Sequence, residues 1–590
     1  MNRMNKQMKR LALSLFLLVI LCVSAFGQEQ PKYDFKLNLD KVSSGDNTTV
    51  NQTFSKREYI EGSVLVVAKK PQQDRLTLSA MSHTQALDKI NTVSAGVARS
   101  ANAVLAATYD AVSINSDKVV MMISSKEKTT EELIKELKKD SNVLSAVPNY
   151  IHYISTAKNV ENGKASGQNI PAAASPNDPK YNELWGLSAI NAPSAWDKTT
   201  GKEDVYVVVL DTGIDHEHED LAGNLGTFNG NYAGCGVLQI YDIYKTSGDT
   251  EELIGTNTKK ISRQFDPDDV RLDSWGDLGS HGTHVAGTIG AVGNNSLGVT
   301  GVNWKVRLLG IGMTNVTLDN NNEVQCIDTD GFSTGQIIEG LNIILQQKKA
   351  GLNIRAVNMS WGGWITPQYQ YELENDPYYV AFKAVSDAGV ILVAAAGNEF
   401  QNFDAPGGPG SDPYNPKEDY RWKICEPACF KLANLITVGA VSADKSWCDF
   451  SNYSPNYVDI AAPGAAIMST LPRYVWLNGK VTSEDLYGKY NGTSMAAPHV
   501  TGAVALLCAA YPDKTAGEIK ELLLNNADKN FAKEGKSAYG MLDLGAAMKA
   551  GAPAPTPTPK PSGGSSGCNG GIPFVALLSV MAVTFFKKKI

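Results

Sequence analysis

Apolar residues recur in short runs along residues 58–155, and their spacing switches between the period of a strand and that of a helix. Thr129 with Glu132 forms a capping box just before a helical apolar pattern, which marks the start of one helix. The pattern predicts a strand at 63–68, a helix at 84–93, a strand at 118–123, a helix from 129 to about 139 and a strand at 143–154. This interleaving predicts a small ferredoxin-like α+β unit.

Residues 176–550 have longer apolar runs that alternate with helical stretches. Runs of this kind, without internal polar positions, are typical of strands that are buried on both faces. The predicted strands are 205–210, 306–311, 356–359, 390–395 and 436–441. The fold class is therefore predicted as α/β, a parallel sheet with helices on both faces. Functional groups should gather at the carboxyl ends of such strands, where Asp211 and Asn398 stand.

The two ends of the chain differ from this globular middle. Within residues 1–27, basic residues precede an apolar stretch. Because this stretch is shorter than the roughly 20 residues that a membrane-spanning helix needs, it predicts a secretory signal peptide rather than a membrane anchor. Residues 568–590 combine Cys568, a short apolar run and terminal lysines. They predict a processed sorting tail that attaches the protein to a bacterial cell surface or membrane, with an ordinary tail anchor as the alternative. Polar segments predict a flexible leader at 28–57 and linkers at 156–175 and 551–567.

Composition narrows the class further. With 590 residues, 43% of them hydrophobic, the chain is long enough for more than one domain and is not disordered in bulk. Its net charge of −7 comes without a long basic run, which argues against a nucleic-acid partner. The sequence contains no paired Cys-x-x-Cys motif and no Cys/His set, so a zinc site is not expected. Six cysteines fall within 176–550 and their pairing stays open, although Cys508 is expected to be a buried thiol: Cys235, Cys326, Cys425, Cys429, Cys448 and Cys508.

The stretch Gly492–Pro498 reads Gly-Thr-Ser-Met-Ala-Ala-Pro and precedes a run of small apolar residues. Proline is tolerated in the first turn of a helix, so Ser494 is predicted to stand at a helix N-terminus. A hydroxyl there faces free backbone amides and the positive end of the helix dipole, which suits attack on a carbonyl group. Such a nucleophile also needs a base that is held by a carboxylate.

Two further motifs supply both groups. Asp211 ends an apolar strand in the sequence Asp-Thr-Gly, and His281 begins a helix of small residues in the sequence His-Gly-Thr-His. In these three segments and their order Asp, His, Ser, the chain resembles the subtilisin-like serine proteases, or subtilases. A lipase of the α/β-hydrolase type would need Gly-x-Ser-x-Gly and the order Ser, Asp, His instead.

The resemblance implies a role for each residue. Asp211 would orient the base His281, Ser494 would be the nucleophile, and Asn398 would donate a hydrogen bond to the oxyanion. Substrate would be held as an added strand between two edge segments, Ser360-Trp361-Gly362 and Ala395-Ala396-Gly397. Trp361 is expected to wall a large apolar pocket, with core packing as the alternative.

The resemblance also implies a zymogen. Residues 58–155 would be a propeptide that assists folding and inhibits the enzyme until it is cut within the linker 156–175, and an unrelated accessory domain is the alternative. The expected protein is a secreted, monomeric endopeptidase that acts on proteins or peptides. A catalytically silent surface-binding protein with the same fold is the alternative function.

A structural calcium ion is the implied cofactor, because hard oxygen donors suit calcium. The expected ligands are the side chains of Asp178, Asp220 and Asn295 and the carbonyl groups of Val292, Leu297 and Val299. The acidic residues between 266 and 277 are expected to form a polar insertion without a site. The resemblance is weakest around the insertions 227–277 and 400–422.

Overall fold

The computed structural model describes residues 59–70, 83–154, 175–228, 231–245, 251–261, 277, 279–318, 324–328, 331–365, 373–404, 424–477, 480–483 and 485–552. The predicted signal peptide, leader and tail, and nearly all of both linkers, lie outside these residues. Their predicted roles therefore stay predictions.

An antiparallel sheet with helices forms the first part of the described chain. Its elements are β1 (Tyr59–Lys69), α4 (His83–Ser100), β2 (Val104–Thr108), α5 (Asp110–Asn115), β3 (Lys118–Ser124), α6 (Thr130–Leu137) and β4 (Val143–Ile154). The four strands lie in the order β4-β1-β3-β2, and every neighbouring pair is antiparallel. This order confirms the predicted ferredoxin-like unit. The capping box of Thr129 and Glu132 is also present at the start of α6.

Two elements of this part were not predicted, β2 and α5. The strand β2 lies at the sheet edge and none of its residues is fully buried, with Val104 64% exposed. Its five residues, Val-Leu-Ala-Ala-Thr, are mostly apolar without alternation, so they show no strand period. The helix α5 has only six residues, too few to show a helical period.

A parallel sheet forms the centre of the second part. Its strands are β5 (Gly201–Asp211), β8 (Cys235–Lys245), β9 (Glu251–Ile261), β10 (Lys305–Leu318), β11 (Val324–Asp328), β13 (Ile354–Met359), β15 (Ile391–Ala395), β17 (Leu435–Val441), β18 (Ile460–Pro463) and β23 (Gly540–Met541). They lie in the order β23-β18-β17-β15-β13-β5-β10-β8-β9, and β11 pairs with β10. All pairs are parallel except those of β9 and β11. The five strands predicted from the sequence form the contiguous centre of this sheet.

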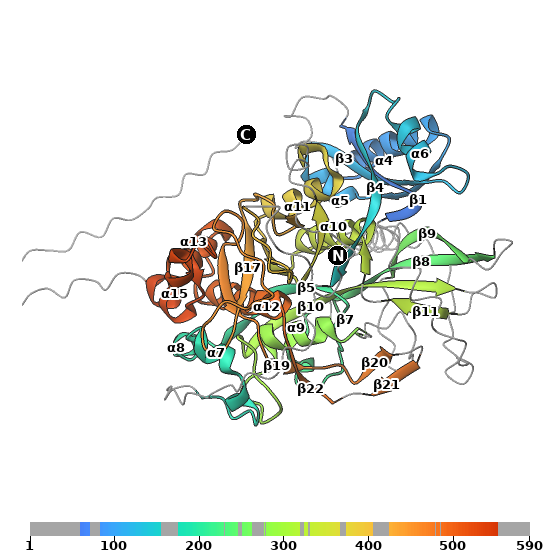
Figure 1. The fold of residues 1–590 in the computed structure, drawn as a ribbon. Helices are drawn as coiled ribbons and strands as arrows, with labels where there is room; N and C mark the ends of the chain where they lie inside the picture. Colours follow the sequence, from blue (N-terminus) through green and yellow to red (C-terminus); the bar gives the residue numbers. More distant parts are fainter. Residues whose placement is uncertain are drawn as a thin grey trace, which may run out of the picture. The chain divides into compact units, whose positions relative to one another are not determined.

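Helices cover both faces of this sheet, as predicted. Val207 and Val209 of β5 belong to a core shared with α9 (His281–Gly290), α12 (Thr493–Ala510), α13 (Ala516–Asn525) and α15 (Leu544–Ala550). Val208 and Leu210 belong to the other core, which is shared with α10 (Thr334–Lys349) and α11 (Pro377–Asp387). Figure 1 shows α10 and α11 on the opposite side of β5 and β10 from α9. Alternate residues of one strand thus feed two cores.

The remaining elements are short and connect or flank this sheet. They are η1 (Tyr181–Glu183), α7 (Trp185–Ala189), α8 (Ala192–Trp196), η2 (Ala222–Asn224), β6 (Thr227–Phe228), β7 (Asn231–Tyr232), β12 (Gly331–Ser333), β14 (Trp361–Ile365), β16 (Ile424–Glu426), β19 (Ile467–Thr470), β20 (Tyr474–Leu477), β21 (Lys480–Ser483), β22 (Tyr487–Tyr490) and α14 (Asn530–Lys533). Among the described helices, α12 alone is long and apolar enough to cross a membrane, but 94% of it is buried inside the fold. It is therefore a core helix.

Candidate active site

Asp211 and His281 meet where β5 ends and α9 begins. The imidazole Nδ1 of His281 lies 2.8 Å from Oδ1 of Asp211, and both side chains are almost completely buried. The helix can approach the strand end so closely because residue 282 is glycine: a Cβ there would lie 2.1 Å from the carbonyl oxygen of Gly213. The glycines of the two motifs therefore serve to bring the carboxylate and the imidazole together.

Ser494 stands in the first turn of α12, as predicted. Its hydroxyl donates to the carbonyl oxygen of Ser360, at 2.9 Å, and the residue is completely buried. Ser360 directly follows β13, which pairs with β5 through Asn358 and Val209. Ser360 and Asp211 are each two residues beyond this pair. The Ser494 hydroxyl and the Asp–His pair therefore lie at the carboxyl ends of neighbouring strands.

Pro498 is the sixth residue of α12, which begins at Thr493, so it lies in the second turn and the prediction that it belongs to the first turn was wrong. A proline at this position cannot donate to the carbonyl group of Ser494, four residues earlier. The hydroxyl of Ser360 donates to that carbonyl instead, at 2.8 Å. The proline is tolerated because a side chain replaces the missing donor.

Asn398 lies beside the start of α12. Its Oδ1 accepts hydrogen bonds from the backbone amide of Thr493, at 2.9 Å, and from the Thr493 hydroxyl, at 3.0 Å. The amide of Gly397 in turn donates to the Thr493 hydroxyl, at 3.1 Å. These bonds use the oxygen end of the Asn398 side chain as an acceptor and fix its amide group beside the residue that precedes Ser494.

Asp277 belongs to the site, although the sequence placed it in a polar insertion. It is only 1% exposed, and its carboxyl group accepts from the Thr212 hydroxyl and the Thr283 amide, each at 2.6 Å. Burial raises the pKa of Asp277 to about 6, the Asp211 charge adds to the rise, and the two threonines oppose it. The side chain therefore joins the loop after Asp211 to the first turn of the His281 helix.

We expect the free energy of unfolding to depend on the protonation of Asp277. Its pKa in the folded chain, about 6, exceeds the 3.8 of a free Asp, so its contribution is complete below about pH 4 and is lost as the pH rises through 6. The free energy of unfolding of the wild type relative to Asp277→Asn should fall by up to about 3 kcal/mol over that range. Urea unfolding at several pH values measures this. If the difference between the wild type and Asp277→Asn were the same at every pH, as for the exposed control Asp513→Asn, the carboxyl group of Asp277 would not titrate in this pH range.

The end of β4 lies between two strands of the second part of the chain. On one side, Ile151, His152 and Tyr153 pair antiparallel with β12, and on the other side Tyr153 and Ile154 pair antiparallel with Gly362 and Trp361 of β14. One predicted edge segment, 360–362, is therefore beside this added strand. The second edge is Gly331–Ser333, which sequence analysis did not single out.

The other predicted edge segment, Ala395-Ala396-Gly397, has a different place. Ala395 ends β15, a central strand, and pairs with Val438 of β17. The amide of Ala396 donates to the carbonyl oxygen of the same Val438, at 3.0 Å. Because these backbone groups are engaged in the main sheet, this segment does not pair with β4, whose second partner is β12.

Trp361 is packed in the core, which was the alternative to its prediction as a pocket wall. The ring is completely buried, and its indole N–H donates to the carbonyl oxygen of Leu210, at 2.6 Å. It makes edge-on contacts with Phe332 and with His152 of the added strand, with ring centroids 6.2 and 6.3 Å apart. The indole therefore supports the strand end that carries Asp211, and one edge touches β4.

The residues predicted for the calcium loop lie together and are joined by hydrogen bonds. Asp220 accepts from the side-chain amide of Asn295 and from the backbone amide of Val299, each at 2.8 Å, while Asp178 accepts from the backbone amide of Asn295, at 3.2 Å. Burial raises the pKa values of both Asp178 and Asp220, and the charge of Asp178 adds to the rise at Asp220. Two carboxylates that disfavour each other's charge, within a loop of oxygen donors, fit a hard cation.

The carbonyl groups assigned to this loop are compatible with that set. Among the described residues, no hydrogen bond reaches the carbonyl oxygens of Val292, Leu297 or Val299. No group of three or more His, Cys, Asp or Glu side chains converges anywhere in the described part of the chain. Any metal held here would therefore depend on backbone carbonyls as well as on carboxylates.

Cys508 is a buried thiol on α12, as predicted, and burial raises its pKa to about 11. Cys425 and Cys448 are likewise buried thiols. The side chain of Cys326 lies outside the described residues.

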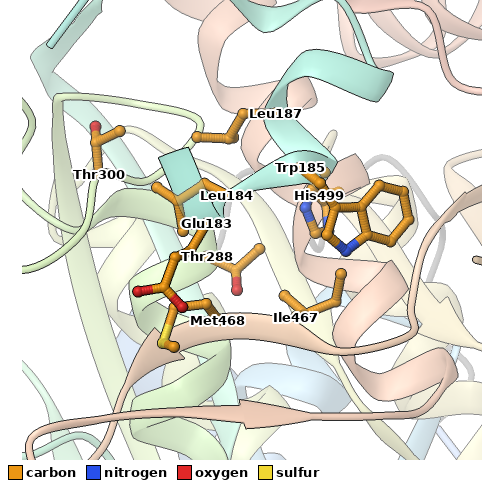
Figure 2. A pocket seen from close by; sticks show the side chains of 10 residues that line it. Glu183, Leu184, Trp185, Leu187, Thr288, Thr300, Ile467, Met468 and His499 are labelled. Carbon is orange, nitrogen blue, oxygen red and sulfur yellow. The ribbon is translucent and has the colours of Figure 1, made fainter. Parts of the chain in front are cut away.

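A separate surface pocket lies between α7, α9 and β19 (Figure 2). Trp185, Ile467 and His499 are among its lining residues, and none of the predicted site residues is. The imidazole of His499 is hydrogen-bonded to the backbone of its own helix: its Nδ1 lies 2.9 Å from the carbonyl oxygen of Met495. The pocket is thus distinct from the site at the strand ends.

Comparisons with known proteins agree with this geometry. The model of the Subtilase family matches residues 202–541. Subtilisin amylosacchariticus from Bacillus subtilis subsp. amylosacchariticus is 30% identical over 400 residues, which cover 67% of this chain and 73% of that protein. An extracellular protease from Xanthomonas campestris pv. campestris is 29% identical over 65% of this chain, and fervidolysin from Fervidobacterium pennivorans is 31% identical over 63%.

The match spans 58% of the Xanthomonas protease and 44% of fervidolysin. The crystal structure of fervidolysin, described as a keratinolytic enzyme related to subtilisin, matches with a TM-score of 0.55 and 24% identity. It covers 85% of this chain and 62% of that one. At this identity the likeness concerns the fold, which it confirms.

Proposed function

Because the chain belongs to the subtilase family, we propose that it is a serine endopeptidase that hydrolyses peptide bonds in proteins through Asp211, His281 and Ser494. The observation that carries this proposal is the 2.8 Å contact between His281 and Asp211, beside the strand end that holds the Ser494 hydroxyl. A serine hydroxyl is a weak nucleophile until a base accepts its proton. The buried pair at the end of β5 is suited to that role.

Each residue has one task in the proposed reaction. The oxygen of Ser494 forms a bond to the substrate carbonyl carbon while its proton passes to Nε2 of His281. Asp211 keeps the imidazole in the tautomer with Nδ1–H and stabilises the imidazolium. The oxyanion is held by the Asn398 amide group and by the Ser494 backbone amide. His281 then gives its proton to the leaving amine, and water hydrolyses the acyl-enzyme by the same steps.

The direct test is proteolysis by the purified protein. We expect it to digest casein and to lose this activity after treatment with phenylmethylsulfonyl fluoride, which sulfonylates activated serine hydroxyls. A folded protein that leaves casein intact would instead support the catalytically silent surface-binding protein. No lost catalytic group favours that alternative, since all three triad residues are present.

The segment 58–155 is proposed to be an inhibitory propeptide. Support comes from the end of β4, which occupies the place of an added strand between β12 and β14. A chain held there by backbone pairing blocks any other peptide from the same position. Cleavage after this strand, within 156–175, would let the propeptide leave. Its extracellular relatives support secretion, and attachment through the tail stays a prediction outside the described residues.

A calcium ion is proposed to bind Asp178, Asp220, Asn295 and the carbonyl groups of Val292, Leu297 and Val299, and to neutralise the loop. At a free calcium concentration about 100 times the dissociation constant, the folded state should gain about 2.7 kcal/mol. Thermal unfolding with calcium and with a chelator measures this gain. Asp220→Asn should remove most of it, whereas the exposed Asp513→Asn should keep it. An unfolding temperature that is unchanged by chelation would contradict the proposal.

A further inference from the structure

His152 of the added strand enters a closed recess in the second part of the chain. The residue is 1% exposed, whereas the next residue, Tyr153, is 43% exposed and points away. Because His152 pairs with Phe332 of β12, its backbone position is the one a bound peptide would occupy in the same groove. The recess around His152 therefore describes a side-chain subsite, provided that the proposed proteolytic function holds.

An aromatic ring and a hydroxyl define the shape and polarity of this recess. The imidazole stacks on Tyr378 of α11, with centroids 4.8 Å apart and planes inclined by 21°. Its Nε2 lies 2.9 Å from Oγ1 of Thr334, the first residue of α10. The Tyr378 ring therefore accommodates a flat side chain, and the Thr334 hydroxyl accommodates a polar atom on its edge.

The hydrogen bonds select one form of the imidazole. The Thr334 hydroxyl donates to the carbonyl oxygen of Tyr150, at 3.2 Å, so it accepts a proton from Nε2 of His152. In the neutral ring, this places the lone pair on Nδ1. Burial lowers the pKa of His152 to about 3, which agrees with a neutral ring.

Glu426 closes the recess on the Nδ1 side. Its Oε1 lies 3.9 Å from Nδ1 of His152, and that nitrogen has no hydrogen-bond partner among the described residues. Burial raises the pKa of Glu426 well above its usual range, which favours the protonated carboxyl group, the form that can act as a donor towards Nδ1. A proton donor here complements the same tautomer that Thr334 selects.

Residue 363 is glycine because the imidazole occupies the space of a side chain. A Cβ on Gly363 would lie 2.4 Å from Nδ1 of His152. A phenylalanine in the recess would stack on Tyr378 but leave the Thr334 hydroxyl without its hydrogen bond to the ring. Sites built to bind a polar group discriminate strongly against analogues that lack it.

We propose that Thr334, Tyr378 and Glu426 form a histidine-selective subsite, so that the enzyme prefers protein substrates with histidine in the place of His152. The propeptide strand would then carry the residue that the enzyme prefers and would also block the substrate groove.

The test uses the purified, processed enzyme and synthetic peptides with the sequence of residues 149–158, Asn-Tyr-Ile-His-Tyr-Ile-Ser-Thr-Ala-Lys. Replacing the histidine by phenylalanine should lower kcat/KM about tenfold, the effect of one well-made hydrogen bond. Replacing the following tyrosine by alanine is the matched control and should change it less than about threefold. Equal kcat/KM for the histidine and phenylalanine peptides would overturn the subsite.

Enzyme variants assign the preference to the recess. Thr334→Val should remove the difference between the two peptides, and Thr334→Ser, which keeps the hydroxyl, should retain it. Persistence of the full preference in Thr334→Val would overturn the role of this residue. If peptides and casein both stay intact, the proposed proteolytic function fails as well, whereas casein digestion with equal peptide rates rejects only the subsite.

Discussion

Replacing Ser494 by alanine should abolish casein hydrolysis and leave residues 58–155 attached to the chain. The substitution removes the only atom that forms the acyl bond, and its small volume change spares the buried start of α12. The expected loss in kcat is about a millionfold, a magnitude taken from subtilisin itself. Casein assays and the size of the purified chain on a denaturing gel measure both effects.

The matched control is Ser386→Ala, which removes a buried serine of α11 that bonds to Asn434 and lies outside the site. It should process itself and digest casein like the wild type. Self-processing by Ser494→Ala at the wild-type rate would mean that another residue, or another protease, makes the cut.

Replacing Asn398 by leucine should lower kcat about 10²–10³-fold and change KM little, a size found for the corresponding donor of subtilisin. The oxyanion forms only after the hydroxyl attacks, so the lost hydrogen bond matters in the transition state and not in substrate binding. Steady-state kinetics on a peptide substrate separate the two parameters.

A second variant separates catalysis from structure. Asn398 accepts two hydrogen bonds from Thr493, and Asn398→Asp keeps this acceptor while it removes the donor. We expect Asn398→Asp to lose activity as Asn398→Leu does. If Asn398→Asp stayed fully active, the residue would merely hold the start of α12.

The central strands and the triad segments were predictable because each has a local signal. The strands of the parallel sheet are buried on both faces, so they are unbroken apolar runs, as in Val205–Leu210. The catalytic segments carry glycines wherever two backbones approach, as at Gly282. The central strands of the sheet and the place of Asp211 at a strand end follow from these signals, whereas the strand order was not predicted.

Other features depend on distant partners and leave no local trace. Asp277 is acidic within an acidic stretch, and only its threonine partners, Thr212 and Thr283, reveal a buried positioning role. The strand β12 has three residues, too few for a period, and is defined by its pairing with β4. Trp361 was assigned to a pocket because side-chain direction cannot be read from a motif.

The most direct measurement is to map the adduct of phenylmethylsulfonyl fluoride by mass spectrometry in the wild type and in His281→Ala. If Asp211 and His281 activate the Ser494 hydroxyl, the wild type should carry one sulfonyl group, on Ser494, and His281→Ala should carry almost none. An adduct on another residue, or equal labelling of Ser494 in both proteins, would contradict the proposed triad.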